Sequence, residues 1–540
     1  MKKKFITLLL FVIPMLTFAQ EKGLDQKIDE AFKPISDFFK AVIFFPIYKG
    51  EGIEIPFVLL LLVASAAFFT IYFKFPNVFH FKTAINVVRG KYDELDHHSS
   101  GDPALAIDGD IKGTIEDESK DGEVTHFQAL ATAVSGTVGN GNIAGVALAI
   151  ALGGPGATFW MVVCGFLGMS TKFVECTLGV QYRDIGEDGT VYGGPMYYIS
   201  KGLKERGFEI LGKIVAVIFA IFCIGGSFGG GNAAQSNQAT VVLKELLGLE
   251  STAAGAWIGV VLAILVGVII IGGIKRIASV TEKVVPFMAG LYVLACLYIL
   301  GANFSLIDDA FSLIYREAFN PTAIGVGGFI GVLLVGFKRA AFSNEAGAGS
   351  SSIAHSAVKT KYSASEGLVA LLEPFIDTVV ICTMTALVII IFNFGGDASG
   401  ATIFQYGGDG EGAVMIGGES FEGAGITSKA FAAYIPYSNV FLTVAVVLFA
   451  VSTMISWSYY GLQSWKYLFG RGKAADMAYK LLFLIFVVIG AAASMKSIWD
   501  FSDAMIFAMV FPNMVGLYFL FPVVKKQLKR YTDAIKTNKA

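Results

Sequence analysis

The segment 135–142 places glycines, amides and hydroxyls inside an apolar stretch that is long enough to cross a membrane. It reads Ser-Gly-Thr-Val-Gly-Asn-Gly-Asn. A glycine in a helix interior costs about 1 kcal/mol relative to alanine, and an amide side chain that faces lipid is more unfavourable still. A helix interrupted here, with its freed backbone groups lining a cavity, removes this conflict. The alternative interpretation is an unbroken helix whose glycine-rich face packs closely against a neighbour.

An interruption at this place would expose two kinds of backbone group. N–H groups at the start of the second half-helix, near Asn140 to Asn142, suit a carboxylate, and the helix dipole adds to this preference. Carbonyl groups at the end of the first half-helix, near Ser135 and Val138, suit a small hard cation. The segment therefore predicts a site where a carboxylate ligand and a cation bind close together.

The segment 336–347 is a second candidate interruption, because it follows an apolar span and combines both signs of charge with an amide and several small residues. Charges inside a membrane need partners. The available carboxylates are those of Glu345, Glu373 and Asp377. Alternatively, Lys338 and Arg339 mark the end of the span. Two interruptions in corresponding positions of two halves would indicate a site between repeats near the bilayer midplane.

Two other apolar helices carry polar residues that fit around such a site. The segment 229–237 contains three glycines and the amide of Gln235, which either lines a cavity or bonds one helix to another. Ser452 and Thr453 are adjacent hydroxyls one turn before Trp457. Such hydroxyls supply oxygen ligands to a cation or bond their own backbone carbonyls.

The composition excludes an ordinary soluble enzyme. The 540 residues are 55% hydrophobic and 16% charged, with a mean hydropathy of +0.65, whereas soluble domains carry roughly 25% charged residues. Lys and Arg number 41 against 43 Asp and Glu, so there is no positive surplus to bind nucleic acid. The five cysteines and five histidines show no metal-site spacing, and no hydrolase or metalloprotease motif is present. The sequence predicts an all-α polytopic membrane protein with about eleven spans and no enzymatic activity.

The spans suggest one peripheral helix followed by two sets of five helices in inverted repeat. The predicted regions are a signal peptide at 1–20, an amphipathic periplasmic segment at 21–55, an additional transmembrane helix at 56–76, a cytoplasmic loop at 77–123, five-helix repeats at 124–307 and 308–524, and a basic tail at 525–540. An uncleaved signal anchor is the alternative for the first region.

Lys and Arg gather in alternate connections, which are retained on the cytoplasmic side. The connections 74–91, 183–206 and 466–480 and the tail 525–539 are basic, whereas the loop 395–425 has no Lys or Arg. An odd number of spans then places the mature N-terminus in the periplasm and the C-terminus in the cytoplasm. This predicts a protein of the bacterial inner membrane.

These residues resemble the alanine or glycine:cation symporter family, also called sodium:alanine symporters. The matching motifs are Gly-Asn-Ile-Ala-Gly-Val at 141–146, Gly-Gly-Pro-Gly-Ala-Thr-Phe-Trp-Met at 153–161, Gly-Gly-Pro-Met-Tyr-Tyr-Ile at 193–199, Phe-Ser-Asn-Glu-Ala-Gly at 342–347 with Ile-Ala-His at 353–355, and Glu-Pro-Phe-Ile-Asp-Thr at 373–378. The chain departs from the family at Thr158, where an apolar residue is usual, and at Val162, where Trp is usual. The resemblance implies a leucine-transporter-like fold and Na⁺-coupled, sometimes H⁺-coupled, uptake of small neutral amino acids such as alanine and glycine.

The resemblance also implies roles for individual residues. The substrate site would take in Gly136, Gly139, Asn140, Gly141, Phe228, Gln235, Phe337, Phe342 and Trp457. Of these, the Asn140 and Gly141 amides would hold the carboxylate, and the choice between Phe337 and Phe342 as a pocket wall is open. The sodium site would be formed by Ser135, Val138, Ser452 and Thr453, with Thr137 and Asn142 near a second ion.

The resulting hypothesis is a secondary symporter in which sodium is the coupling ion and no other cofactor takes part. Its partners would be a small neutral amino acid, sodium and the lipid bilayer, without nucleic acid. One alternative is proton coupling through Glu175, Glu345 or Asp377. A channel and a membrane-embedded enzyme are the remaining alternatives.

Overall fold

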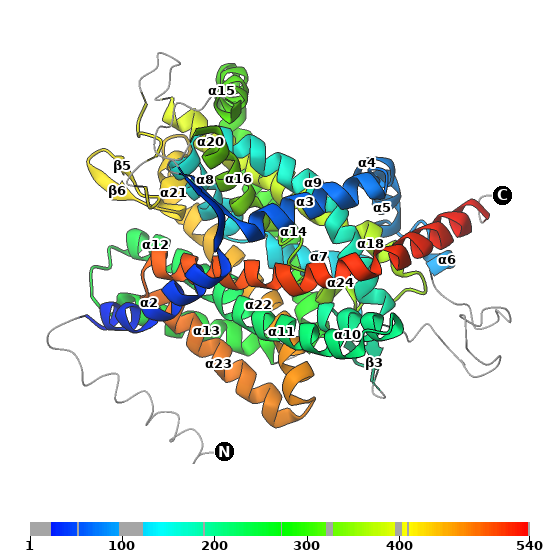
Figure 1. Cartoon of the computed structure of the whole chain (residues 1–540). Coiled ribbons are helices and arrows are strands. Elements are labelled where there is room, and N and C mark those ends of the chain that lie inside the picture. Colours follow the sequence, from blue (N-terminus) through cyan, green and yellow to red (C-terminus); the bar gives the residue numbers. More distant parts are fainter. Residues whose placement is uncertain are drawn as a thin grey trace.

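Long apolar helices run side by side between two ends of the molecule (Figure 1). The computed structural model describes residues 23–50, 53–96, 122–186, 189–271, 273–319, 328–394, 402–407 and 410–537. The predicted signal peptide at 1–20, and residues 97–121 of the predicted loop, lie outside the described residues. Helix α24, red in Figure 1, extends from the end that holds α2 and α12 to the end that holds α10, and these are called the α2 end and the α10 end below.

The N-terminal part consists of a helix packed on the bundle, a hairpin and one apolar helix. Its elements are α2 (Leu24–Ile43), β1 (Pro46–Gly50), β2 (Ile53–Pro56), α3 (Phe57–Tyr72), α4 (Pro76–Phe79), α5 (Phe81–Val88) and α6 (Asp93–Asp96). Helix α2 buries Phe32, Ser36 and Ile43 along one face. The Ser36 hydroxyl donates to the carbonyl of Ser497 over 2.7 Å, which ties α2 to the start of α24.

The first half of the core contains two spans with π-helical turns in their middle. Its elements are α7 (His126–Thr137), η2 (Gly141–Gly145), α8 (Val146–Gly153), α9 (Gly156–Gln181), β3 (Asp184–Ile185), β4 (Val191–Tyr192), α10 (Pro195–Glu205), α11 (Glu209–Phe228), η3 (Gly229–Ala233), α12 (Ala234–Leu247), α13 (Ala254–Ile270) and α14 (Gly273–Ala302).

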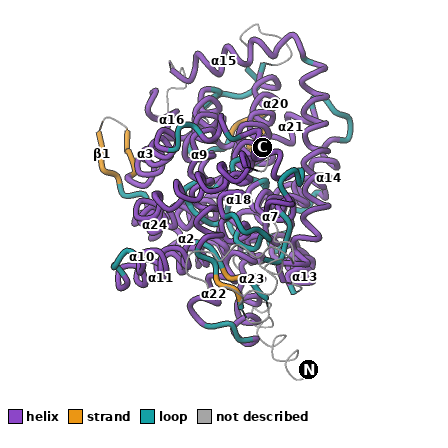
Figure 2. Tube along the Cα trace, turned by 90° about the vertical axis from the view of Figure 1, so that its right-hand side faces the viewer, coloured by secondary structure: helices purple, strands orange, loops and turns teal. Residues whose placement is uncertain are grey.

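The second half begins with a helix near the α2 end and finishes with the longest described helix. Its elements are η4 (Phe304–Leu306), α15 (Ile307–Phe319), α16 (Gly328–Asn344), α17 (Ser352–His355), α18 (Ser363–Ala370), α19 (Leu372–Pro374), η5 (Phe375–Cys382), α20 (Thr383–Asn393), β5 (Val414–Ile416), β6 (Glu419–Phe421), α21 (Ala424–Ala432), α22 (Ser438–Phe469), α23 (Lys473–Ala492) and α24 (Met495–Thr537). Within the described ranges, the strands form three small antiparallel hairpins. Figure 2, seen from the α10 end, shows that helices make up nearly all of the bundle.

Seven helices among the described residues are long and apolar enough to cross a membrane, and the bent pair of α7 with η2 and α8 makes an eighth. Helices α3 and α13 are apolar but shorter. This confirms the predicted all-helical polytopic class. The count of about eleven spans and the division into two five-helix repeats stay predictions.

Candidate functional site

The first predicted interruption is present in the structure. A capping box, in which Thr125 and Gln128 satisfy each other's backbone N–H groups, starts α7. The helix ends at Thr137, Val138 takes an extended conformation with φ −73° and ψ 91°, and the next half-helix departs at 51°. The residues of the segment 135–142 are all buried. The helix is therefore interrupted in the middle of the bundle, and the alternative interpretation, an unbroken helix with a glycine-rich face, is wrong.

Side chains meet the N–H groups that the interruption frees. The Gly139 amide donates to Asn142 Oδ1 over 2.9 Å, and the Asn140 amide donates to Gln235 Oε1 over 3.0 Å. Gln235 in turn donates from Nε2 to the carbonyl of Gly230 over 2.9 Å. Gln235, for which the sequence allowed either a place in a cavity wall or a bond between helices, therefore lies directly at the break in α7.

Oxygen atoms from α7 and α22 converge beside the same break. The Thr453 hydroxyl donates to the carbonyl of Ser135 over 3.0 Å, and the Ser135 hydroxyl donates to the carbonyl of Ser452 over 2.9 Å. The Ser452 hydroxyl bonds the carbonyl of Phe449 in its own helix. Three of the four residues expected to form a sodium site are therefore in mutual contact, and the fourth, Val138, is the residue at which α7 ends.

A buried carboxylate forms a second polar cluster on the other side of the break. Asn142 Nδ2 donates to Asp377 Oδ1 over 2.6 Å, and the Ser343 hydroxyl donates to the same oxygen over 3.1 Å. The Thr378 hydroxyl donates to Asp377 Oδ2 over 2.6 Å. Thr137 does not join this cluster, because its hydroxyl contacts carbonyls of its own helix. The cluster connects the first interruption to α16 and η5.

The second interruption begins later in the chain than the sequence predicts. Helix α16 runs unbroken through Lys338 and Arg339 and ends at Asn344. Glu345 then adopts a left-handed backbone with φ 57°, and Gly347 follows with φ 95°. A left-handed backbone conformation is unfavourable for residues other than glycine, and it persists only where contacts with the surrounding structure stabilise it. The interruption therefore lies at 345–351 rather than across 336–347.

The partner of the two basic residues in α16 is one that the sequence did not indicate. Lys338 Nζ lies 2.8 Å from Asp503 Oδ2, and Arg339 bonds the same oxygen. Neither basic residue pairs with Glu345, Glu373 or Asp377 in the structure. Asp503 of α24 is the shared ion-pair partner of both basic residues, and α16 continues through them to Asn344.

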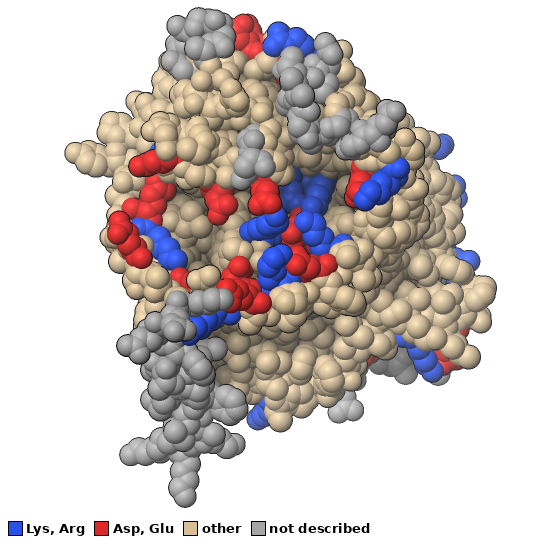
Figure 3. All heavy atoms as spheres, turned by 60° about the vertical axis from the view of Figure 1, so that its left-hand side comes forward, with Lys and Arg blue, Asp and Glu red and all other residues tan. Residues whose placement is uncertain are grey.

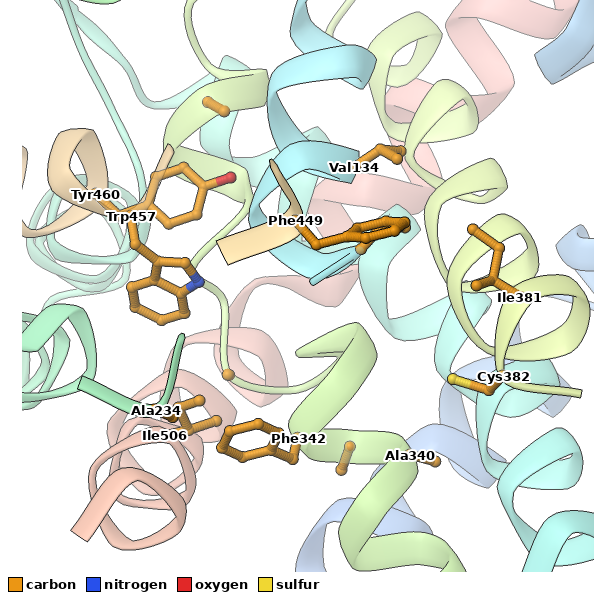
Figure 4. Packing of buried hydrophobic residues seen from close by; sticks show 14 of the residues in the cluster. Val134, Ala234, Ala340, Phe342, Ile381, Cys382, Phe449, Trp457, Tyr460 and Ile506 are labelled. Carbon is orange, nitrogen blue, oxygen red and sulfur yellow. The ribbon is translucent and has the colours of Figure 1, made fainter. Parts of the chain in front are cut away.

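A narrow cavity lies between the two interruptions. It has a volume of about 10 Å³, the room of roughly one water molecule. The residues lining it are Gly136, Thr137, Gly141, Gly230, Gln235, Phe342, Ser343, Glu345, Trp457 and Ile506. Figure 4 shows Phe342 and Ile506 below the indole of Trp457. An amino acid would enter this space only when side chains such as Gln235 move.

The structure separates the aromatic candidates. Phe342 and Trp457 line the cavity. Phe337 lies on another face of α16, with its ring 5.9 Å from that of Trp160. Phe228 stacks on Phe486 at 4.6 Å, outside the cavity lining. Phe228 and Phe337 therefore do not line the cavity in this structure, because helix packing turns both rings away from it.

Glu345 is a cavity residue whose place the sequence did not assign. Trp457 Nε1 donates to Glu345 Oε1 over 2.8 Å, and the Ser350 hydroxyl bonds the other oxygen. Ser343 and Ile506 are further residues without a predicted site role, and Asp377 was predicted only as a candidate for proton coupling or for pairing with the charges of 336–347. The available signal for Glu345 and Asp377 was a carboxylate inside an apolar stretch.

A membrane-spanning helical bundle with a buried polar cavity between two interrupted helices has the construction typical of secondary transporters. Residues 49–540 match the family model described as the sodium:alanine symporter family. The chain therefore belongs to this transporter family and is not an enzyme.

Curated relatives agree with this assignment. The chain is 40% identical to "Sodium/alanine symporter AgcS" of Methanococcus maripaludis, over 79% of this chain and 88% of the relative. It is 35% identical to "Putative sodium/proton-dependent alanine carrier protein YrbD" of Bacillus subtilis, over 77% of this chain and 82% of the relative. It is 31% identical to "Probable sodium/glutamine symporter GlnT" of the same organism, over 77% and 80% of the two chains. Among solved structures, MhsT in complex with L-phenylalanine is 13% identical over 75% of this chain and 99% of that chain, with a TM-score of 0.47.

Proposed function

We propose that this transporter moves a small neutral amino acid, alanine or glycine, into the cell together with Na⁺ by alternating access. The observation that carries the proposal is the break in α7, where amide groups and a cluster of oxygen atoms lie side by side. A carboxylate and a cation that bind next to each other attract one another, so each raises the affinity of the other. This mutual effect is the requirement for coupling.

The substrate carboxylate would bind the backbone N–H groups of Asn140 and Gly141. The Asn140 N–H group donates a hydrogen bond to Gln235 Oε1 in this structure, so Gln235 would have to move first. Phe342 and Trp457 would enclose the substrate side chain. Gly139 leaves no room for a larger residue, because an added Cβ would lie 2.4 Å from Thr453 Oγ1. The tight walls favour alanine and glycine over larger amino acids.

Sodium would bind the carbonyls of Ser135 and Val138 and the hydroxyls of Ser452 and Thr453, since Na⁺ is a hard cation that prefers oxygen ligands. A second sodium is proposed at Asp377, with Asn142 and Ser343 as further ligands. The carboxylate of Asp377 would supply the negative charge that a buried cation needs. Lysine and arginine in alternate connections support an inner-membrane orientation with a cytoplasmic C-terminus.

Proton coupling through a carboxylate is the second candidate. Glu345 lines the cavity and bonds Trp457, so its protonation would alter the substrate site directly. Glu175 and Asp377 remain further candidates for the same role. Uptake that is driven by a pH gradient without Na⁺ would favour this candidate.

The test is uptake of labelled alanine, glycine and serine, in both enantiomers, into proteoliposomes at fixed pH with and without a Na⁺ gradient. We expect accumulation only with the gradient. The double variant Ser452→Ala with Thr453→Ala should weaken Na⁺ stimulation by about 5- to 150-fold, the usual range of coupling between two ligands. Ser458→Ala is the matched control, because the Ser458 hydroxyl bonds only a carbonyl of α22 itself. Full Na⁺ stimulation in the double variant would contradict the sodium site.

A further inference from the structure

A series of buried ionisable side chains leads from the cavity to the α10 end of the bundle. Its members, called the ionic chain below, are Glu345, Lys172, Glu373, His355, Glu366 and His126. None of these residues is more than 5% exposed. They come from α7, α9, α17, α18, α19 and the interruption after α16. The proposed transport function uses only the first member, so the others need a separate explanation.

The ionic chain begins at the cavity wall. Glu345 bonds the Ser350 hydroxyl, and the next residue, Ser351, accepts a hydrogen bond of 2.5 Å from Lys172 Nζ. The same ammonium group donates to Glu373 Oε1 over 3.0 Å. Glu345, which lines the cavity, is thus connected to Lys172 of α9 through the adjacent residues Ser350 and Ser351.

Two histidines and two carboxylates alternate in the remaining part. His355 Nε2 lies 3.5 Å from Glu373 Oε2, and its Nδ1 lies 2.5 Å from Glu366 Oε1. The second oxygen of Glu366 bonds His126 Nδ1 at the start of α7. Each imidazole and carboxyl group in this series can accept or release a proton. Neighbouring groups lie within hydrogen-bonding distance of each other, except at the longer contact between His355 and Glu373.

The charges of this region do not balance without an additional proton. Glu175 also belongs to the region, since it accepts from the Gly347 amide and from Asn513 Nδ2. Four carboxylates, those of Glu175, Glu345, Glu366 and Glu373, then face three groups that can be positive, Lys172, His126 and His355. Even with all three charged, one negative charge is left over, and an uncompensated buried charge is strongly unfavourable.

Among the described residues, Lys172 is the only lysine or arginine that pairs with a carboxylate of this region. Arg183 donates to the carbonyls of Ser356 and Val358 instead. The other ionisable neighbours are Cys176 of α9, Tyr198 of α10, Cys223 of α11, Tyr460 of α22 and Asp377 of η5, and none of these groups carries a positive charge. A proton held on one of the carboxylates is therefore the simplest way to reduce the negative charge.

Opening the α10 end would disturb this arrangement. His126 stands on α7, the first half of the interrupted helix, whereas Glu366 and His355 stand on α18 and α17. A movement of α7 away from α17 and α18 separates His126 from Glu366 and admits water. Water favours the ionised form of a carboxyl group, so the shared proton would leave.

We propose that the ionic chain is a proton-binding site, which holds a proton while the α10 end is closed and releases it when that end opens. This inference rests on the proposed function, because binding of Na⁺ and substrate is what would trigger the opening. It does not require that protons drive uptake, since the proton can return along the same path in each cycle.

The experiment measures proton release from the purified full-length protein in detergent, in weak buffer with a pH-indicator dye, when Na⁺ and alanine are added together. We expect release of up to about one proton per protein near neutral pH, where histidine-containing networks titrate. His355→Gln and Glu366→Gln should abolish the release. The matched controls His80→Gln and Glu317→Gln, which remove one imidazole and one buried carboxyl group outside the ionic chain, should keep it.

Calorimetric binding of alanine in the same samples separates the two proposals. The wild-type titration is repeated in buffers of different ionisation enthalpy, which gives the number of protons released on binding. This measurement needs no substitution, so it remains possible if the variants are unstable. Na⁺-dependent alanine binding without proton release would overturn the inference and leave the proposed function intact. Proton release that persists unchanged in both variants would also overturn it. Absence of Na⁺-dependent binding of alanine and glycine to the wild type would instead overturn the proposed function, and with it the trigger for proton release.

Discussion

The two ends of the bundle differ in where their charged side chains lie: around an open pocket at the α2 end and inside the protein at the α10 end. At the α2 end, a pocket of about 310 Å³ is lined by charged residues of both signs, including Lys338, Arg339, Lys496, Glu411 and Asp503. Figure 3 shows this end as a hollow in which blue and red side chains gather. At the α10 end, the ionic chain is sealed inside the protein. The comparison shows a molecule that is hollowed on one side of its cavity and closed by paired charges on the other.

The separation between the pocket and the cavity is thin. Phe342 lines the cavity and Trp499 lines the pocket, and their ring centroids are 4.9 Å apart. The Arg339 guanidinium lies over both rings, at 5.4 Å and 5.1 Å from their centroids. Substrate that reaches the cavity from the α2 end would have to displace this stack, whereas at the α10 end it would have to separate several buried ion pairs.

The largest expected effect concerns the stability of the two ends. Lys172→Met should destabilise the protein by about 3–5 kcal/mol, because it leaves the buried carboxylate of Glu373 without its cation. Lys496→Met at the α2 end should cost less than about 1 kcal/mol, since its pair with Glu411 is about half exposed. Thermal unfolding in detergent, followed by tryptophan fluorescence, measures both. Similar losses in the two variants would mean that the ends do not differ as described.

A smaller change in free energy, seen as reduced transport, is expected from crowding the site between the two ends. Gly139→Ala should reduce Na⁺-driven alanine uptake by at least about tenfold, because overpacking costs typically 1–3 kcal/mol and the new Cβ meets Thr453 Oγ1. Gly290→Ala is the matched control, since an added Cβ there meets no atom within 4 Å. Uptake by proteoliposomes with equal protein content provides the comparison. Unimpaired uptake by Gly139→Ala would show that the break in α7 tolerates a side chain.

The smallest effect is expected at the separation itself. Phe342→Ala joins the pocket of the α2 end to the cavity and should shift substrate preference toward larger neutral amino acids, by about tenfold or less. Phe337→Ala removes the same ring from another face of α16 and should leave the preference unchanged. Competition of unlabelled amino acids against labelled alanine measures the shift. Equal changes in both variants would argue that Phe342 affects only the packing of α16.

Local sequence was sufficient for some of these features. The glycines and amides of 135–142 stand in an apolar run, and the conflict between polar groups and lipid can be resolved only by an interruption or by packing. The same reasoning identified the hydroxyls of Ser452 and Thr453. The interruption was predictable because it depends on neighbouring residues and on the solvent that surrounds a membrane helix, whereas the role of Ser452 and Thr453 as cation ligands stays a prediction.

Other features depend on contacts between distant parts of the chain. Phe337 and Phe342 are five residues apart, which places them about 140° apart around a helix, and only the packing of α16 decides which one faces the cavity. The second interruption begins at Glu345, inside the predicted segment 336–347, but a residue without glycine's backbone freedom gives no local signal that the break starts there. Asp503 lies on α24, far from Lys338 and Arg339 in sequence.

Residue types and their order are enough to predict a helical membrane protein that resembles the symporter family, with a break in the helix that begins near His126. Burial of apolar residues in lipid and the cost of unsatisfied backbone groups act on each segment separately, so they can be inferred from composition and pattern. The packed helices, in contrast, are needed to see which charges are paired, which aromatic rings enclose the cavity and which end is closed. Those outcomes depend on which side chains from different helices come within a few ångströms of each other, and pairing at that range determines whether a buried charge is tolerated.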